Sequence, residues 1–337
     1  MMMRKKGQPL QLALCSIVML LLILDAKTAL TGAREGIFLC IYSVLPSLFP
    51  FLIVSQMLTS RLVGTTVSFL RPISKLCAIP KGAETILLLG FLGGYPVGAQ
   101  AVTDACRQGH IDKDDANRLL GFCNNVGPSF LFGMFGPLFS SLYIPWALWF
   151  IHILSALTVG AILPNKKDSS CKLTVSVPMT LPQAMERAIR IMANICGWVI
   201  AFRVIIAVLS RWFLWLLPLQ AQILTSGLLE LSNGCHALRA LPSEASRFII
   251  SSAITAWGGL CVGMQTVSVT GNLGTGAYFP GKVLQCLFSV LLASLLLPVL
   301  FKTAMPVPAM FFLGIAAGSI IIIQRLFCRK KTVAICS

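Results

Sequence analysis

The stretch that decides the fold is Thr85-Ile-Leu-Leu-Leu-Gly-Phe-Leu-Gly-Gly-Tyr-Pro-Val-Gly-Ala-Gln-Ala-Val-Thr-Asp-Ala105. It is long and apolar enough to cross a bilayer, for which about 20 helical residues suffice. Its centre, Gly93-Gly-Tyr-Pro96, is typical of a chain break, because glycine permits positive φ and proline has no N–H to donate. The stretch is therefore either a kinked spanning helix or a re-entrant hairpin whose two arms each rise about 15 Å.

The basic residues of the chain favour the hairpin. If this stretch and a similar one at 222–239 both span, the 27 Lys and Arg divide 13 inside and 13 outside, with Arg203 in the bilayer. If both are re-entrant, the division is 20 inside, with Lys282 counted in a cytoplasmic loop, and 6 outside. Short cytoplasmic loops carry an excess of Lys and Arg. We therefore expect two re-entrant hairpins, and N and C termini in the cytoplasm.

Composition places the chain among polytopic membrane proteins. Of its 337 residues, 56% are hydrophobic and 11% charged, against about 25% charged in soluble domains. The net charge of +16 lies in short loops, where it sets orientation and contacts lipid headgroups, so we expect a lipid bilayer as partner and no nucleic acid. The predicted fold is all-α, with eight transmembrane helices at 10–30, 36–60, 119–140, 145–163, 188–210, 247–268, 283–301 and 308–326.

The two halves of the chain repeat one outline of predicted elements: a span, a connection, a hairpin and a second span that opens at a basic residue. The span at 36–60 runs inward and that at 188–210 runs outward, which predicts an inverted-topology repeat whose hairpin tips meet near the membrane centre. The predicted segments are an N-terminal span at 1–30, a first repeat at 31–165, a cytoplasmic linker at 166–182, a second, inverted repeat at 183–301, and a last span with a basic cytoplasmic tail at 302–337.

Three motifs carry a resemblance to a known family. They are Gly90-Phe-Leu-Gly-Gly-Tyr-Pro-Val-Gly-Ala99, Arg118-Leu-Leu-Gly-Phe-Cys-Asn-Asn-Val-Gly-Pro128 and Glu230-Leu-Ser-Asn-Gly-Cys235. They resemble signatures of the YlbJ-like sporulation integral membrane proteins, within the nucleoside-recognition or Gate domain group, over roughly residues 30–300. The resemblance implies a role in endospore formation, in the mother-cell or outer forespore membrane. It supplies no substrate, because a fold-level analogy does not define a site.

Two charged residues, Arg203 and Glu230, fall inside the predicted hydrophobic regions. Each costs about 2.5–3.5 kcal/mol to insert and is by default a functional candidate. Glu230 precedes Asn233-Gly234, the predicted tip of the second hairpin, and can hold a cation, solute hydroxyls or a coupling proton. The alternative is an interfacial helix that leaves Glu230 in water. Arg203 can pair with Glu230, bind an anion or extend to the interface.

Asn124 and Asn125 stand just before Gly127-Pro128, where proline frees backbone carbonyls of the preceding turn. This pattern predicts a broken helix that faces a cavity; the alternative is interhelical hydrogen bonding that only packs the spans, at about 0.6 kcal/mol per bond. Thr255 occupies the matching region of the second half. The candidate solute-binding residues are Gly93, Gly94, Tyr95, Pro96, Gly98, Asn124, Asn125, Gly127, Pro128, Arg203, Glu230, Asn233, Gly234 and Thr255.

Signatures of catalysis and of cofactors are missing from the sequence. The three histidines are dispersed, the twelve cysteines form no Cys-x-x-Cys pair, and the acidic cluster Asp112-Lys-Asp-Asp115 is interpreted as an N-terminal helix cap. We expect no enzyme activity, cofactor or metal. The predicted function is transporter- or channel-like binding of an unknown small solute. The alternatives are a non-transporting scaffold for spore cortex or coat assembly and a membrane-embedded enzyme. The expected protein partners are further copies of the chain, in a homo-oligomer, or sporulation membrane proteins.

Overall fold

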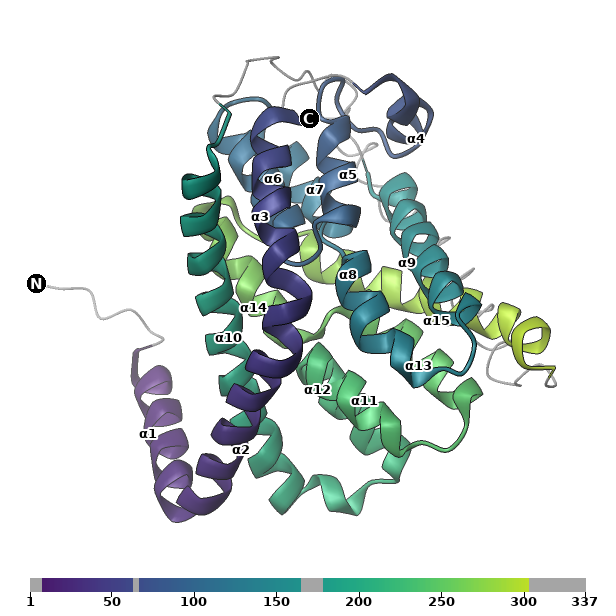
Figure 1. The fold of residues 1–337 in the computed structure, drawn as a ribbon. Helices are drawn as coiled ribbons and strands as arrows, with labels where there is room; N and C mark the ends of the chain where they lie inside the picture. Colours follow the sequence, from purple (N-terminus) through teal and green to yellow (C-terminus); the bar gives the residue numbers. More distant parts are fainter. Residues whose placement is uncertain (1–7, 63–66, 165–177, 303–337) are drawn as a thin grey trace, which may run out of the picture.

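An apolar chain in lipid must satisfy its backbone hydrogen bonds internally, which helices do. The computed structural model describes residues 8–62, 67–164 and 178–302, and all regular elements in these ranges are helical (Figure 1). In chain order they are α1 Gln8–Leu24, α2 Ala26–Leu39, η1 Cys40–Val44, α3 Leu45–Leu62, η2 Ser68–Leu70, α4 Arg71–Leu76, α5 Glu84–Leu92, α6 Val97–Arg107, α7 Lys113–Cys123, α8 Pro128–Phe130, η3 Leu131–Phe135, η4 Gly136–Leu138, α9 Tyr143–Ile162, α10 Leu181–Trp212, η5 Leu214–Leu216, α11 Leu219–Leu229, α12 Leu231–Ala237, η6 Leu238–Ala240, α13 Glu244–Trp257, α14 Gly259–Thr270, η7 Gly271–Leu273 and α15 Tyr278–Phe301.

Five helical segments of the described part are long and apolar enough to cross a membrane. They confirm that the chain is an all-α, multi-pass membrane protein, and they coincide with five of the eight predicted spans. The segments are Ala26–Leu62, Tyr143–Ile162, Leu181–Trp212, Glu244–Thr270 and Tyr278–Phe301.

Two of the other three predicted spans are interrupted. The span predicted at 10–30 divides at Asp25, where α1 ends and α2 begins. The span predicted at 119–140 stops at Cys123 and resumes at Pro128, because the residues between are extended and proline cannot donate to a continuing helix. The span predicted at 308–326 lies outside the described residues.

Both stretches predicted as hairpins form pairs of short helices. α5 and α6 are separated by Gly93–Pro96, the predicted break, and pack against each other. α11 and α12 meet at Glu230 and also pack together. The α5–α6 pair lies toward one end of the molecule and the α11–α12 pair toward the other (Figure 1). That the pairs re-enter one membrane face each stays a prediction.

The order of elements repeats between the halves. A long helical segment (α2 to α3), a short connection, the α5–α6 pair, a broken helix (α7, α8) and a long helix (α9) are followed by α10, a connection, the α11–α12 pair, a broken helix (α13, α14) and α15. This order matches the predicted repeat. The domain boundaries and the inverted relation of the halves stay predictions.

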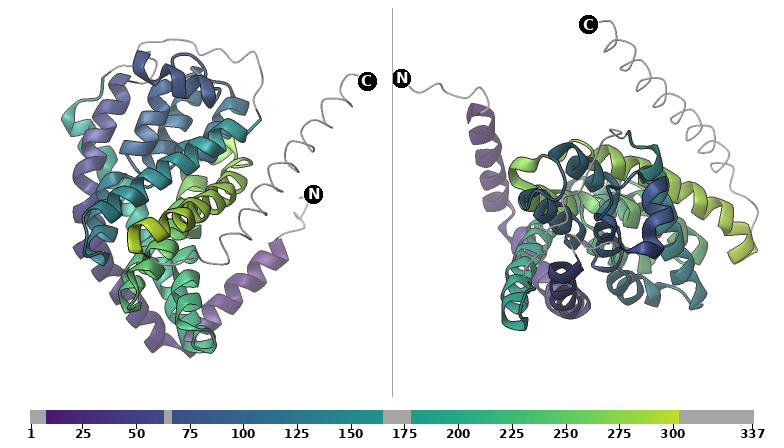
Figure 2. Two further views of the ribbon diagram at one scale, coloured as in Figure 1. Left: turned by 90° about the vertical axis from the view of Figure 1, so that its right-hand side faces the viewer. Right: turned by 90° about the horizontal axis from the view of Figure 1, so that it is seen from above.

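The long helices α2 and α10 lie side by side through small residues, and α1 projects away from this bundle (Figure 2). A Cβ added to Gly32 would lie 2.8 Å from the Cβ of Ala207, and one added to Gly36 would lie 2.9 Å from the Cα of Ile200. Glycine at these positions lets the two backbones approach closely, as in other membrane helix pairs. We call α2, η1, α3 and α10 the scaffold.

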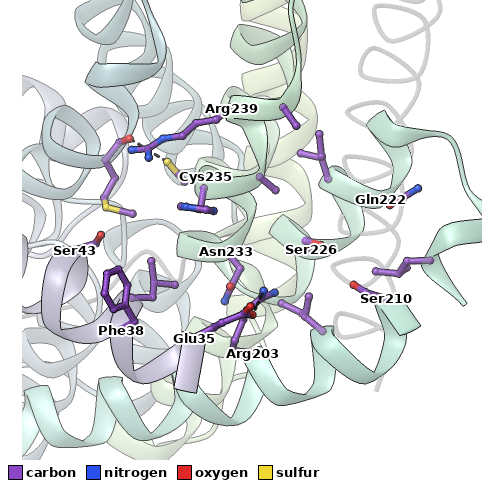
Figure 3. Close-up of a pocket in the computed structure, with 18 of the residues that line it drawn as sticks. Glu35, Phe38, Ser43, Arg203, Ser210, Gln222, Ser226, Asn233, Cys235 and Arg239 are labelled. Atoms are coloured by element: carbon purple, nitrogen blue, oxygen red, sulfur yellow. Dashed lines mark hydrogen bonds and ion pairs between the residues drawn. The ribbon is translucent and has the colours of Figure 1, made fainter. Parts of the chain in front are cut away.

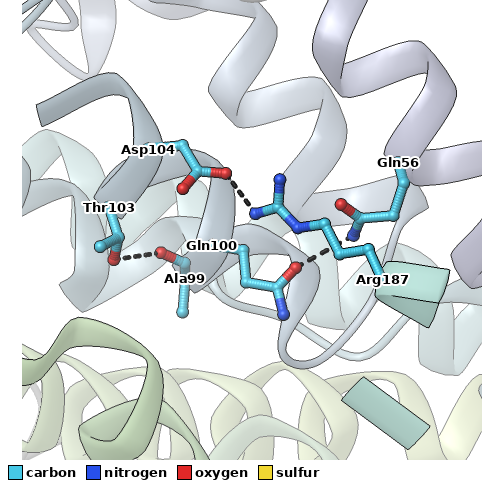
Figure 4. Close-up of polar contacts among 6 residues, drawn as sticks. All are labelled: Gln56, Ala99, Gln100, Thr103, Asp104 and Arg187. Atoms are coloured by element: carbon cyan, nitrogen blue, oxygen red, sulfur yellow. Dashed lines mark hydrogen bonds and ion pairs between the residues drawn. The ribbon is translucent and has the colours of Figure 1, made fainter. Parts of the chain in front are cut away.

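Polar contacts tie α6 to this scaffold (Figure 4). Gln56 of α3 donates from Nε2 to Oε1 of Gln100 of α6 at 3.0 Å, and both side chains are buried. Arg187 of α10 forms an ion pair with Asp104, one turn further along α6. The second arm of the α5–α6 pair is therefore held by both long scaffold segments.

The predicted cap at the start of α7 is confirmed. Asp112 accepts a hydrogen bond from the backbone N–H of Asp115 at 2.7 Å. A carboxylate at this place satisfies a free N–H and complements the helix dipole. The acidic cluster therefore has a structural role in beginning α7.

Candidate functional site

The breaks of α5–α6 and of α7–α8 lie against each other. Gly94 has a φ of +75°, and a Cβ added to it would lie 3.0 Å from the backbone nitrogen of Gly127. On either side of this break, a Cβ at Gly90 or at Gly98 would lie 1.9 or 2.1 Å from the carbonyl oxygen of Cys123. These distances are far below van der Waals contact, so glycine is required for the close approach. The helix pair thus fixes the extended segment that follows α7.

The second half brings its breaks together in the same way. Gly258, with a φ of +82°, separates α13 from α14. A Cβ added to the next residue, Gly259, would lie 3.1 Å from the backbone nitrogen of Leu231, at the start of α12. Within the α11–α12 pair, a Cβ at Gly234 would lie 2.2 Å from the Cα of Gly227. Each half therefore packs a glycine-lined helix pair on a broken helix.

Tyr95 joins the two halves. Its side chain is buried, and its hydroxyl donates to the carbonyl oxygen of Thr255 in α13 at 3.3 Å. A Cβ on Gly258 would lie 2.8 Å from the same hydroxyl oxygen. The breaks of both halves consequently meet around one aromatic ring.

A small cavity lies at this meeting point. Tyr95 and Gly127 from the first half and Glu230 and Gln265 from the second are among its lining residues. Its volume is about 30 Å³, which is room for about two water molecules. We call it the central cavity.

Glu230 is buried at the break between α11 and α12, with 2% of its surface exposed. Its carboxylate accepts three hydrogen bonds: from the backbone N–H of Ser232 at 3.0 Å, and from the backbone N–H and Nδ2 of Asn233, both at 2.7 Å. Three donors stabilise a carboxylate at a place that is otherwise apolar. The interpretation of Glu230 as a water-exposed residue of an interfacial helix is therefore wrong.

Lys282 is the site residue that the sequence analysis missed. It was counted in a cytoplasmic loop, but it lies in α15 and is fully buried. Its Nζ is 2.8 Å from Oε1 of Gln285, 3.3 Å from Oδ1 of Asn125 and 3.3 Å from the hydroxyl of Tyr95. None of the ion pairs in the described ranges includes Lys282. It is a buried base held by neutral oxygen atoms.

Asn125, Gln285 and His152 extend the polar contacts of Lys282. Gln285 donates from Nε2 to Oδ1 of Asn125 at 3.0 Å and to the carbonyl oxygen of His152 at 3.4 Å. Asn125 also donates from Nδ2 to the carbonyl oxygen of Phe122 at 2.7 Å, so it satisfies a carbonyl freed by the break in α7, as predicted. We call Tyr95, Asn125, His152, Lys282 and Gln285 the central polar cluster.

Asn124 and Thr255, two of the predicted solute-binding residues, have different roles in the structure. Asn124 accepts from the backbone N–H of Ala99 at 3.2 Å and donates to Oγ1 of Thr266 in α14 at 2.9 Å, so it joins the halves. The hydroxyl of Thr255 donates to the carbonyl oxygen of Ser251 at 2.6 Å, within its own helix. Only the backbone carbonyl of Thr255 reaches the site, through Tyr95.

Arg203 lies apart from the central cavity. It forms an ion pair with Glu35 of α2 across the scaffold, so the proposed pairing with Glu230 is wrong. Both residues line a second cavity of about 540 Å³, which is bounded by α2, η1, α10 and the α11–α12 pair (Figure 3). The sequence offered no signal for this pair, because its members are far apart in the chain. We call this cavity the α11–α12 cavity.

The centre between the two halves is rich in buried polar side chains. The central polar cluster and Glu230 supply donors and acceptors that stay fixed by their neighbours. Within the described ranges, no group of three or more His, Cys, Asp or Glu is placed to hold a metal ion, and eight cysteines are free. The polar contacts of Glu230 and Lys282 named above are hydrogen bonds with neutral groups.

Comparison with known proteins identifies a relative. The chain is 23% identical over 320 residues to the sporulation integral membrane protein YlbJ of Bacillus subtilis (strain 168), which covers 80% of this chain and 78% of that protein. Neither a family model nor a solved structure matches the chain. The predicted resemblance to YlbJ is confirmed: the chain is YlbJ-like over most of its length. The Gate domain and nucleoside-recognition part of the resemblance stays a prediction.

Proposed function

We propose that this chain is a transporter-like membrane protein that binds a small polar solute between its two halves and acts in endospore formation. The observation that carries the proposal is the convergence of the helix breaks on Tyr95, Glu230 and Lys282. Transporters commonly place their substrate sites at discontinuous helices near the bilayer midplane. The same convergence is the predicted consequence of an inverted repeat.

The burial of an acid and a base supports binding over simple packing. Glu230 and Lys282 are both buried, each is held by neutral groups, and they do not pair with each other. Each ionisable group in a membrane interior costs about 2.5–3.5 kcal/mol, whereas apolar side chains of similar size cost nothing there. A protein that only needed to pack these helices would be more stable without them.

The size of the central cavity indicates how the site would work. With about 30 Å³ free, it holds no solute larger than a few water molecules. Solute entry therefore requires a helix pair to move away from its broken helix. Because α6 is tied to the scaffold through Gln56–Gln100 and Arg187–Asp104, the α11–α12 pair is the better candidate for this motion.

The proposed place of action rests on the relative. YlbJ is a sporulation integral membrane protein, and the coverage of the two chains is high enough for a shared architecture. We therefore infer a role in sporulation, and the resemblance of the three motifs implies the mother-cell or outer forespore membrane as its place. A non-transporting scaffold for cortex or coat assembly is the competing proposal, and it predicts that changes at the buried centre leave sporulation intact.

Glu230→Gln tests the proposal in a spore-forming host. The variant is expected to lower the yield of heat-resistant spores by roughly tenfold or more, because a hydrogen bond to a charged group contributes about 1.5–3 kcal/mol and 1.4 kcal/mol is a factor of ten. Heat-resistant colony counts measure the effect, and immunoblots of membranes confirm the protein level. Glu186→Gln, an exposed acid of α10, is the matched control. Normal spore yield from Glu230→Gln at normal protein level would favour the competing function, a non-transporting protein that assembles cortex or coat.

A further inference from the structure

The α11–α12 cavity has no role in the function proposed above. Its volume of about 540 Å³ falls in the range of small-molecule pockets, about 300–1,000 Å³. The central cavity, with about 30 Å³, is far smaller. The α11–α12 cavity is therefore large enough for a small organic solute, whereas the central cavity is not.

The inner end of this cavity touches the support of Glu230. Asn233 lines the cavity, and its Nδ2 donates to Oε2 of Glu230 at 2.7 Å. Ser226 also lines it, and its carbonyl oxygen accepts from the backbone N–H of Glu230 at 2.8 Å. Glu230 itself lines the central cavity. Residues that line the α11–α12 cavity are therefore hydrogen-bonded to Glu230, which lines the central cavity.

The outer end opens at a surface that has the character of a membrane interface. Ser210 lines the cavity and is exposed, whereas Ser226 and Asn233 are buried. Near Ser210, Trp212 at the end of α10 and Trp215 in η5 are exposed. Tryptophan is enriched where the bilayer meets water. The cavity therefore runs from an interface inward to Asn233.

The lining indicates the kind of solute that fits. The scaffold contributes apolar side chains such as Leu39 and Ile206 and also the ion pair Arg203–Glu35, and the helix pair contributes polar side chains such as Ser226, Asn233 and His236. Apolar surface beside charged and hydrogen-bonding groups suits a small organic molecule that has an apolar face and a polar one.

We propose that the α11–α12 cavity is an outer binding site and vestibule, open to the outside of the cell, through which a small amphipathic solute reaches the Glu230 centre. This rests on the proposed function. The direction follows from the basic residues, since Arg211 and Arg239 of this end belong to the minority expected outside. The α11–α12 pair both lines the vestibule and covers the centre, so its movement would connect the two cavities.

Two native cysteines provide a test on the wild-type chain. Cys235 lines the vestibule and Cys261 does not, and the two are almost equally buried, with 1% and 0% exposed. Intact cells that express the full-length protein are treated with a membrane-impermeant methanethiosulfonate, and peptide mass spectrometry measures modification of both residues in the same sample. We expect Cys235 to react about tenfold faster or more, because thiol modification follows access. Equal rates would overturn the vestibule.

A second experiment measures the same labelling in a variant whose larger side chain fills the vestibule. Ser226→Trp should fill the vestibule and slow modification of Cys235 about tenfold, while Cys261 stays unchanged. Modification of Cys235 that is unaffected by the substitution, or that occurs only in inside-out vesicles, contradicts the proposal. Labelling needs no solute movement. A protein that transports nothing can therefore still show the vestibule, and a transporter can lack it.

Discussion

Gly90→Ala is expected to destabilise the protein by about 3 kcal/mol or more, at the upper end of what overpacking costs. A Cβ at Gly90 in α5 would lie 1.9 Å from the carbonyl oxygen of Cys123, and backbone cannot move aside as a side chain can. Gly98→Ala in α6 meets the same atom at 2.1 Å and should behave alike. Either change would push the helix pair away from the broken helix and disrupt the centre.

Gly197→Ala is the matched control. Gly197 lies in helix α10, and a Cβ there would meet nothing within 4 Å. Alanine favours a helix interior over glycine by up to about 1 kcal/mol, so this variant should be as stable as the wild type or slightly more stable. Thermal unfolding of detergent-solubilised protein compares the three variants. A melting temperature of Gly90→Ala equal to that of Gly197→Ala would show that the contact between α5 and Cys123 does not exist.

Lys282→Met is expected to abolish solute uptake and heat-resistant sporulation while leaving the protein folded in the membrane. Methionine fills the space of the lysine stem. The change leaves Oε1 of Gln285 without the Lys282 donor, at about 1–3 kcal/mol, whereas Oδ1 of Asn125 keeps its hydrogen bond from Nε2 of Gln285. It also removes the cost of burying a charge. The net change in stability is therefore small, whereas the binding group is lost.

Lys113→Met, at the exposed start of α7, controls for the loss of a positive charge. Uptake by proteoliposomes and thermal unfolding of the same preparations separate function from folding. A folded Lys282→Met protein with wild-type uptake would assign Lys282 a packing role only. A protein that loses uptake and stability together would contradict the separation that we expect.

The parts of the fold that follow from local chemistry were predicted. Gly93-Gly-Tyr-Pro96 interrupts a helix by its own backbone preferences, and the break is present between α5 and α6. Asp112 caps α7 because a carboxylate beside free N–H groups is stabilising wherever the helix packs. Glu230 was found because an acid inside an apolar stretch is conspicuous without any partner.

The parts that depend on tertiary contact were missed. Lys282 follows Pro280 and Gly281, residues that usually mark loops, and only packing shows that Gly281 lies in a helix against Gly121. Its partners Asn125 and Tyr95 are more than 150 positions away in sequence. The prediction of topology from basic residues assumes that each lysine lies in a loop. A lysine that is buried inside the protein, as Lys282 is, therefore cannot be identified in this way.

Uptake from a complex mixture tests directly whether the protein binds a solute at Glu230 and Lys282. Proteoliposomes with the wild-type protein, with Glu230→Gln or with Lys282→Met, and liposomes without protein, are incubated with the small-molecule extract of sporulating cells. Mass spectrometry then compares their contents. We expect at least one small polar solute that is enriched by the wild-type protein and falls to the level of protein-free liposomes in both variants. Equal contents in all four preparations would contradict a solute-binding centre at Glu230 and Lys282.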